Sequence, residues 1–378
     1  MKKGTILYVG NFELPDKGAS ANRVVSNGTL FEKLGYRVAF LGVKRGASFD
    51  GIQVLDAERN MYEEAYPQGM KEWFLHMYSV KNIQAAIEAQ GDVCMIILYN
   101  VPFLLLKRVK HALRGSKIQV VYDCTEWTGV TDGSFAKRMV KKLDEYFIRT
   151  KIGNVADGLI VISRRMEAAY AKCKRLLLLP PLVDLQDKIW HQSMEKQSED
   201  FEFCFAGMLD GNKESLDTIV EAFGNLKVKG AKLRIIGVTE QEFCDFYPNG
   251  KNLVEQCKEQ VEFMGRLSHT ETIRYVLHCD SYIFIRQSDT RNNAGFPTKF
   301  SESYSCNVPI IATDISDIKV YMEQRERGSL LSSVSVKEVE KAMLKEMEAG
   351  RERKEEELDK TFHYETYEGV CKSWLEQF

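Results

Sequence analysis

The sequence predicts an α/β protein built from two doubly wound domains that face each other across a cleft. Apolar, strand-like runs alternate with helical patterns, and this alternation occurs twice along the chain. Most of the runs are apolar on both faces, which is typical of parallel sheets covered by helices. The chain has 378 residues, well beyond the roughly 150 of an average domain, so two such domains are expected.

The first domain is expected at residues 1–184. It opens with a strand at 5–10, "TILYVG", and continues with a helix at 20–35 whose apolar residues recur at helical spacing before a glycine stop. A long helix is predicted at 134–153. Further strands are expected at residues 36–43, 92–100, 117–124 and 157–163.

A polar stretch without a strand pattern, residues 185–200, predicts a linker to a second domain at 201–355. Strand–helix alternation restarts after this linker. The strands of the second domain are expected at residues 201–207, 232–237, 261–265, 281–286 and 308–313. The last segment, 356–378, is predicted to carry a helix that crosses back to the first domain, because its aromatic and aliphatic side chains recur at helical spacing and need a surface to cover.

Composition excludes several classes of function. The net charge of -2 gives no electrostatic case for binding nucleic acid. The nine cysteines lack CxxC spacing and a Cys/His cluster, which indicates reduced thiols in a cytoplasmic protein. The six histidines show no metal-ligand spacing, so neither a metal nor a cofactor is expected. No apolar run reaches the ~18 residues of a membrane span, and the short N-terminal apolar run does not fit a signal peptide.

The stretch "RNNAGFPTKFSES", residues 291–303, predicts a nucleotide-binding turn between a strand and a helix. A helix that begins near Thr298 directs its free N–H groups at an anion, and neighbouring cations add positive charge. Glu302, about one turn into this helix, is placed to accept hydrogen bonds from a ribose diol. The residues predicted to bind the donor here are Arg286, Gly295, Phe296, Pro297, Thr298, Lys299 and Glu302. The alternative is a solvated loop with surface charges.

Two further strand ends of the second domain are candidates for the same ligand. Lys213 stands just before a helix and is predicted to reach a phosphate, with a solvated helix-start lysine as the alternative. The loop "FMGRLSH" places backbone groups of Arg266 and Leu267 where they could meet a base edge.

The first domain offers a glycine-containing loop and a pair of acids at strand ends. Gly18, Ala19 and Ser20 open a helix and are expected to face a phosphate, but the loop lacks GxGxxG and does not support a dinucleotide fingerprint. Asp123 and Glu126, in "YDCTEWTG", are predicted to face the cleft, where a carboxylate could orient or deprotonate an acceptor hydroxyl. The alternative for both acids is a capping or loop role.

Taken together, these segments resemble the nucleotide-sugar-dependent glycosyltransferases of the GT-B architecture, two Rossmann-like domains, and specifically the retaining family 4 type. "GFPTKFSESYSCNVPIIATD" resembles the donor signature of that family, and "AGMLDGNKESLDTIVEAF" resembles its diphosphate loop with Lys213 as the phosphate lysine. The block at 261–285 resembles its base-binding segment, and the final residues 364–378 resemble its crossing helix. The "DCTEW" and "NAGFPTK" segments are similar to the bacterial surface-polysaccharide branch.

The sequence also departs from the pattern of that family. The family has paired glutamates, but Ala294 stands where the first is expected, eight positions before Glu302. Met208 lies where an arginine usually precedes the phosphate lysine, and the "TEW" segment, with Glu126, replaces the usual first-domain histidine.

The resemblance implies a metal-independent transfer of a sugar, with retention, from a UDP- or GDP-sugar to a hydroxyl of a glycan or lipid-linked acceptor. The expected setting is the synthesis of capsule, exopolysaccharide or another surface glycan. An alternative is a sugar-nucleotide epimerase, or a non-catalytic nucleotide-sugar binder, of the same fold. The basic, amphipathic stretch 135–151 further suggests contact with an anionic membrane surface, at its inner face, or else a helix packed on the core with a solvated basic side.

Overall fold

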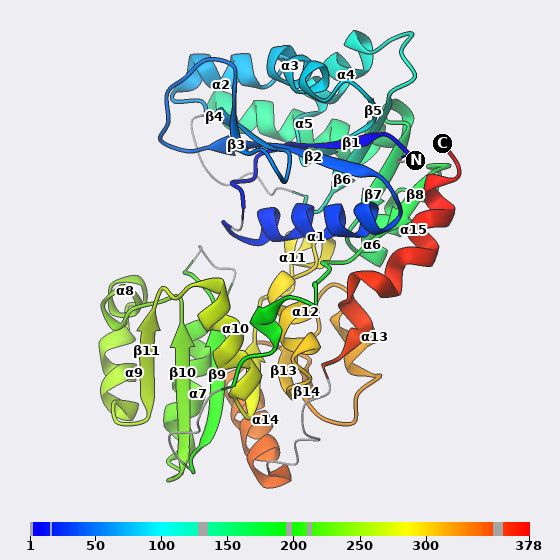
Figure 1. The fold of residues 1–378 in the computed structure, drawn as a ribbon. Helices are drawn as coiled ribbons and strands as arrows, with labels where there is room; N and C mark the ends of the chain where they lie inside the picture. The colour runs from blue at the N-terminus through cyan, green and yellow to red at the C-terminus, as the bar shows by residue number, and fades with distance from the viewer. Residues whose placement is uncertain (1–2, 16, 128–134, 194–198, 210–213, 351–357) are drawn as a thin grey trace. The chain divides into compact units, whose positions relative to one another are not determined.

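The computed structural model describes residues 3–15, 17–127, 135–193, 199–209, 214–350 and 358–378. The chain divides into two compact units. Unit 1 comprises Met1–Leu182, Ala294–Phe296 and Tyr364–Phe378, and unit 2 comprises Val183–Asn293 and Pro297–His363. Each unit contains one sheet covered by helices on both faces (Figure 1), which confirms the predicted two-domain α/β fold.

Unit 1 is built on an eight-stranded sheet with the order β3-β4-β2-β1-β5-β6-β7-β8. The strands are β1 (Thr5–Gly10), β2 (Arg37–Lys44), β3 (Ile52–Asp56), β4 (Met61–Ala65), β5 (Val93–Tyr99), β6 (Gln119–Cys124), β7 (Gly158–Val161) and β8 (Leu176–Leu178). Neighbouring strands are parallel except β3 and β4. The strand order reverses beside β1, between β2 and β5, and this is where an open α/β sheet leaves a crevice for a ligand.

The helices of unit 1 cover the sheet on its two faces (Figure 1). They are α1 (Ala19–Lys33), α2 (Met70–His76), α3 (Lys81–Gln90), α4 (Phe103–Ala112), α5 (Phe135–Val155), α6 (Arg164–Ala169) and the last helix, α15 (Glu368–Leu375), which follows a 3-10 turn, η3 (Tyr364–Tyr367). Val24 and Phe31 of α1 share one apolar cluster with Trp374 and Leu375 of α15. The aromatic and aliphatic stripe of the last segment therefore packs in the core of unit 1.

Unit 2 is built on a six-stranded parallel sheet with the order β11-β10-β9-β12-β13-β14. The strands are β9 (Phe201–Ala206), β10 (Ala231–Ile236), β11 (Val261–Gly265), β12 (Ser281–Phe284), β13 (Ile310–Thr313) and β14 (Ser329–Leu331). Its order reverses beside β9, between β10 and β12. All six residues of β9 are buried, as expected for a strand covered on both faces.

Capping side chains begin three helices of unit 2, α8, α10 and α14. Its helices are α7 (Leu216–Leu226), α8 (Glu240–Phe246), α9 (Gly250–Cys257), α10 (His269–His278), α12 (Thr298–Ser305), α13 (Ile318–Met322) and α14 (Val336–Ala349), with the 3-10 turns η1 (Lys188–Trp190) and η2 (Lys360–Phe362); α11 (Thr290–Ala294) ends at the border of the two units. Ser268 and Glu271 form a capping box at α10, and Thr239 and Glu242 form one at α8. Each box satisfies backbone N–H groups that a helix start leaves unpaired.

The structure adds elements that the sequence pattern did not predict. The β3–β4 pair forms the edge of the first sheet, and exposed Val54 lies on β3, so β3 lacks the continuous apolar run of a central strand.

Inside the range expected to be a linker, Trp190 is buried in unit 2, and Gln192 Nε2 donates a hydrogen bond to the Thr270 carbonyl 3.0 Å away. The described part of this range therefore packs against α10.

Within the part of the chain that the structure describes, none of the helices combines the length and the apolar character needed to cross a membrane.

Candidate functional site

The carboxyl ends of β9, β10 and β11 surround a cavity of about 660 Å³ in unit 2. Met208 follows β9, Gly237 follows β10 and Arg266 follows β11, and all three line this cavity together with the half-exposed Phe246. Carboxyl strand ends are where open α/β sheets bind ligands. The predicted base-binding loop thus has Arg266 on a cavity wall, with Leu267 next to it in the chain and half-buried.

A buried carboxylate joins two of the predicted donor-binding cations. Arg286 Nη2 lies 2.7 Å from Glu214 Oε1, and Lys299 Nζ lies 3.1 Å from the same oxygen. Glu214 also pairs with Arg286 through an isolated antiparallel bridge, and Thr313 Oγ1 accepts from the Arg286 backbone N–H at 3.0 Å. Glu214, Arg286 and Lys299 of helix α12 therefore form one ion cluster. The sequence pattern did not identify Glu214 as a member of the site.

Glu214 is 7% exposed, and burial of this kind opposes the charged form of a carboxyl. Burial would raise the pKa of Glu214, but the charges of Lys299 and Arg286 outweigh it, and the pKa is lowered from its ordinary 4.5. Glu214 Oε2 makes no hydrogen bond within the described residues. A Cβ at Gly207 would lie 2.1 Å from this oxygen, so only glycine leaves room for the carboxylate there.

Glu214→Gln is expected to reduce the acid sensitivity of folding. Because the folded-state pKa is lowered, the carboxylate contributes stability that is present above its unfolded-state pKa and is lost as pH falls through the folded pKa. The Tm of the wild type should therefore fall below about pH 4.5 more steeply than that of the variant. Thermal melts between pH 3 and 7 measure this, with Glu221→Gln on the exposed side of α7 as the control. Parallel curves for the two variants would contradict the expectation.

Glu302, the residue predicted to bind ribose, lies on α12 and contacts α10. Its Oε1 is 2.9 Å from His269 Nε2, and both side chains are partly exposed, at 15% for Glu302 and 31% for His269. His269 follows Ser268 directly and lies three positions beyond Arg266. The contact thus connects the predicted ribose acid to the strand-end loop that carries Arg266, and the sequence pattern contained no signal for this histidine.

The other predicted donor residues fall in different places. Thr298 begins α12, and the buried Pro297 precedes it without a side-chain cap. Gly295 and the buried Phe296 belong to unit 1. Lys213, the predicted phosphate lysine, lies outside the described residues.

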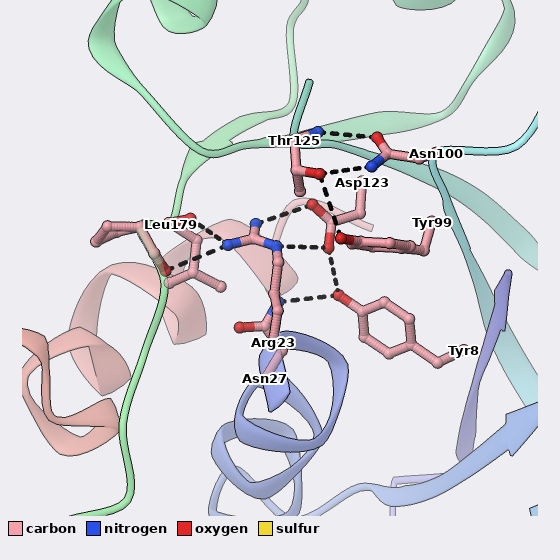
Figure 2. Close-up of polar contacts among 9 residues, drawn as sticks. Tyr8, Arg23, Asn27, Tyr99, Asn100, Asp123, Thr125 and Leu179 are labelled. Carbon is pink, nitrogen blue, oxygen red and sulfur yellow. Dashed lines mark hydrogen bonds and ion pairs between the residues drawn. The ribbon is translucent and has the colours of Figure 1, made fainter. Parts of the chain in front are cut away.

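Asp123 is enclosed inside unit 1, and this corrects the role on the acceptor side that was expected of it. Its side chain is fully buried at the end of β6, and its two oxygens are held by other groups (Figure 2). Arg23 Nη2 donates to Asp123 Oδ1 at 2.9 Å and Tyr8 Oη donates to Oδ2 at 2.9 Å. A carboxylate enclosed in this way has no exposed oxygen for a substrate hydroxyl, so we assign it a structural role.

Arg23, which sequence reasoning did not single out, connects three segments of unit 1. It is 2% exposed, and its Nη1 donates to the Leu179 carbonyl at 2.9 Å and the Pro180 carbonyl at 3.3 Å (Figure 2). Burial, followed by the charge of Asp123, raises the pKa of Tyr8, so its hydroxyl remains a hydrogen-bond donor. Helix α1, strand β6 and the segment after β8 are therefore tied together by one charged network.

Glu126, the second predicted acid, lies three residues beyond Asp123 in a different environment. It is exposed and lines a cavity of about 220 Å³ together with Asn100 and Lys141. Asn100 is fixed by Thr125, whose backbone N–H donates to Asn100 Oδ1 at 3.0 Å (Figure 2). Two acids at the end of the same strand therefore lie in opposite environments: Asp123 is buried and Glu126 is exposed.

The predicted phosphate loop of the first domain lies at the start of α1. Gly18 has a φ of 92°, a conformation that favours glycine, and both Gly18 and Ala19 are exposed while Ser20 is half-buried.

No group of three or more metal-ligating side chains comes together among the described residues.

The second half of the chain is similar to a known protein family. Residues 186–361 match the family described as glycosyl transferases group 1. No curated protein matches the chain. Sucrose-phosphate synthase from Thermosynechococcus elongatus is similar in structure, with a TM-score of 0.70 at 15% identity over 99% of each chain.

Two further solved structures are similar in fold. HepE from Anabaena, in complex with UDP and glucose, matches with a TM-score of 0.66 at 12% identity over 99% of this chain and 100% of that chain. Trehalose 6-phosphate synthase from Burkholderia multivorans matches with a TM-score of 0.63 at 10% identity over 100% of this chain and 99% of that chain. The protein therefore has the GT-B fold of glycosyltransferases, and its second half is similar to glycosyl transferases group 1.

Proposed function

We propose that the protein is a metal-independent, retaining glycosyltransferase that moves a sugar from a UDP- or GDP-sugar to a hydroxyl of a glycan or lipid-linked acceptor. The observation that carries the proposal is the match of residues 186–361 to glycosyl transferases group 1. Two structural neighbours support the ligand class, because HepE was solved with UDP and glucose and an E. coli structure described as trehalose-6-phosphate was solved with UDP-2-fluoro glucose. The proposed setting is the synthesis of a bacterial capsule, exopolysaccharide or other surface glycan.

The donor side is proposed to stabilise the leaving diphosphate by fixed charges. Arg286 and Lys299 carry two positive charges against the single negative charge of Glu214, which leaves a net charge of about +1 beside the start of α12. Helix N-termini and cations of this kind stabilise negative charge that grows on a leaving group, without proton transfer. Arg266, at the cavity of the base loop, is proposed to approach the nucleoside.

The acceptor side is proposed to use Glu126. Its carboxylate is exposed at a strand end, whereas Asp123 is fully enclosed. An exposed carboxylate can accept a hydrogen bond from an acceptor hydroxyl and orient it. Glu126→Gln should therefore lower transfer while leaving the affinity for the donor nearly unchanged.

A nucleotide-sugar panel tests the proposal directly. Purified protein is incubated with UDP- and GDP-sugars and candidate glycan acceptors, and NMR follows the nucleoside diphosphate, the new linkage and its anomeric configuration. Retention with full activity in EDTA is the expected result. Inversion, or loss of activity in EDTA, would overturn that part of the proposal. An epimerised donor without acceptor would indicate an epimerase, and tight donor binding without any turnover would indicate a silent binder.

The proposed lipid-linked acceptor would place the protein at the inner face of a membrane, and helix α5 has the side chains for such a surface. Four apolar side chains on it are exposed: Phe135 at 80%, Met139 at 51%, Leu143 at 57% and Tyr146 at 56%. They recur every three or four positions, so they form one stripe along the helix. Exposed cations at positions 138, 142 and 149 lie beside this stripe, and interfacial helices combine apolar and basic side chains in this way.

Arg138→Glu combined with Lys142→Glu is expected to weaken binding to vesicles of anionic lipid. Each basic side chain near such a surface contributes about 1 kcal/mol, so the double variant should bind roughly 30-fold more weakly. Flotation with phosphatidylglycerol vesicles measures this, and Leu344→Ser, at an exposed apolar position on α14, is the control. If the wild type shows no salt-sensitive flotation, the membrane location is wrong.

A further inference from the structure

A second cavity of unit 1, of about 290 Å³, lies at the reversal of strand order in its sheet. Gly10, at the end of β1, and Val101, just beyond β5, both line it. Loop residues after β2 and β4 and side chains of α2 and α3 complete its wall. Because parallel strands present their carboxyl ends at this crevice, it is the position in the first sheet best suited to a ligand.

A chain of polar side chains lines this cavity. Asn82 Nδ2 donates to Glu64 Oε2 at 2.6 Å, and Glu64 Oε1 lies 3.6 Å from His76 Nδ1. His76 Nε2 lies 3.2 Å from Asn11 Oδ1. Glu64, His76 and Asn82 are each half-buried, so their donors and acceptors are held in place before a ligand arrives.

Aromatic side chains border the same cavity. Phe49 comes from the loop after β2, and Tyr66 from the segment after β4; both are half-buried lining residues. The Arg45 guanidinium carbon lies 4.6 Å from the ring centre of Tyr66 and holds that ring through a cation–π contact. Apolar ring faces beside a few fixed polar groups suit a sugar, which has C–H faces and a rim of hydroxyls.

The charge of the lining selects among ligands. Glu64 and Glu72 line the cavity, whereas no lysine or arginine is among its described lining residues. Phosphates and carboxylates need cationic partners when they leave water, so this cavity disfavours both. In this respect it is the opposite of the Arg286–Glu214–Lys299 cluster of unit 2.

From this geometry we infer that the cavity binds an uncharged sugar ring, with the hydroxyls on Glu64, His76 and Asn82 and a C–H face against the aromatic side chains. Asn11 and Pro102 line both this cavity and the one that Glu126 lines, so the two cavities are neighbours. The assignment of the sugar as the acceptor rests on the proposed glycosyl transfer. The binding of a neutral sugar does not depend on it.

Ligand-observed NMR with the full chain tests the inference. The probes are glucose, galactose and N-acetylglucosamine as neutral sugars, and glucuronate and glucose 6-phosphate as anionic ones. We expect neutral sugars to bind the wild type and anionic sugars to bind far more weakly. His76→Ala and Glu64→Gln should each lower the affinity for neutral sugars about tenfold or more, as the loss of a hydrogen bond to a charged group would.

His111→Ala is the matched control, because His111 is an exposed histidine on α4 that does not line this cavity. Phe49→Ala, in a loop, tests the aromatic contact if His76→Ala lowers the Tm. Equal binding of neutral sugars by the wild type, His76→Ala and Phe49→Ala would overturn the inference, and so would preferred binding of glucuronate. Loss of sugar binding in these variants, in a protein that transfers nothing from any UDP- or GDP-sugar, would instead refute the proposed function and leave the sugar site standing.

Discussion

Asp123→Ala is expected to destabilise unit 1 by about 3–5 kcal/mol, because it leaves the guanidinium of Arg23 buried without its carboxylate. Arg23 is 2% exposed, and no solvent can replace the lost partner without a rearrangement of α1. Tyr8 Oη would lose its acceptor in the same substitution. Urea unfolding followed by circular dichroism measures the change in the free energy of unfolding.

Two comparisons make this result specific. Adding Arg23→Met to Asp123→Ala should recover part of the loss, because removing both charges leaves no unpaired ion in the interior. Asp50→Ala, which breaks the exposed pair with Lys81, should change stability little. A fully stable Asp123→Ala protein that has lost only glycosyl transfer would instead restore the catalytic role predicted from the sequence.

Glu302→Ala is expected to weaken binding of the nucleotide sugar by about 10- to 150-fold. A hydrogen bond to a charged group contributes roughly 1.5–3 kcal/mol, and each 1.4 kcal/mol is tenfold in affinity. Glu302 keeps 15% of its side chain exposed beside His269, and its carboxylate is proposed to accept hydrogen bonds from a ribose diol. Titration calorimetry with UDP- and GDP-sugars measures the effect, and Glu302→Gln should lose less because it retains an acceptor oxygen.

The ribose assignment has its own controls. A 2′,3′-dideoxy nucleotide sugar should bind the wild type poorly and lose little further on Glu302→Ala. Glu323→Ala, an exposed acid at the end of α13, should leave donor binding unchanged. Wild-type affinity in a folded Glu302→Ala protein would remove the most specific residue from the glycosyltransferase interpretation.

Much of the architecture could be predicted from the spacing of apolar residues along the chain. The continuous apolar run at 5–10 became β1 and the run at 201–207 became β9, because strands buried on both faces need apolar residues at every position. The edge strands β3, β8 and β14 were missed, and so was β4 beside β3. An edge strand such as β3 exposes side chains that a pattern cannot distinguish from loop residues. The start of the helix near Thr298 was predicted correctly from the glycine and proline that precede it.

The charged residues were harder to interpret. Arg286 and Lys299 are both far from Glu214 in the sequence, and only folding brings the two cations to this carboxylate. Nothing in the local pattern around Glu214 distinguishes it from an exposed helix-start acid. Asp123 and Glu126 looked equivalent as neighbouring acids at one strand end, yet the first is buried and the second exposed.

The sequence by itself determined the alternation of strands and helices, the number of domains and the strand ends at which polar residues gather. These properties depend on local spacing, because backbone geometry repeats every two residues in strands and every 3.6 in helices. Only the tertiary structure decided which charges are paired, which acids are buried and which side chains share a cavity. Those properties depend on contacts between residues such as Tyr8 and Asp123, which are 115 positions apart, and no local pattern encodes them.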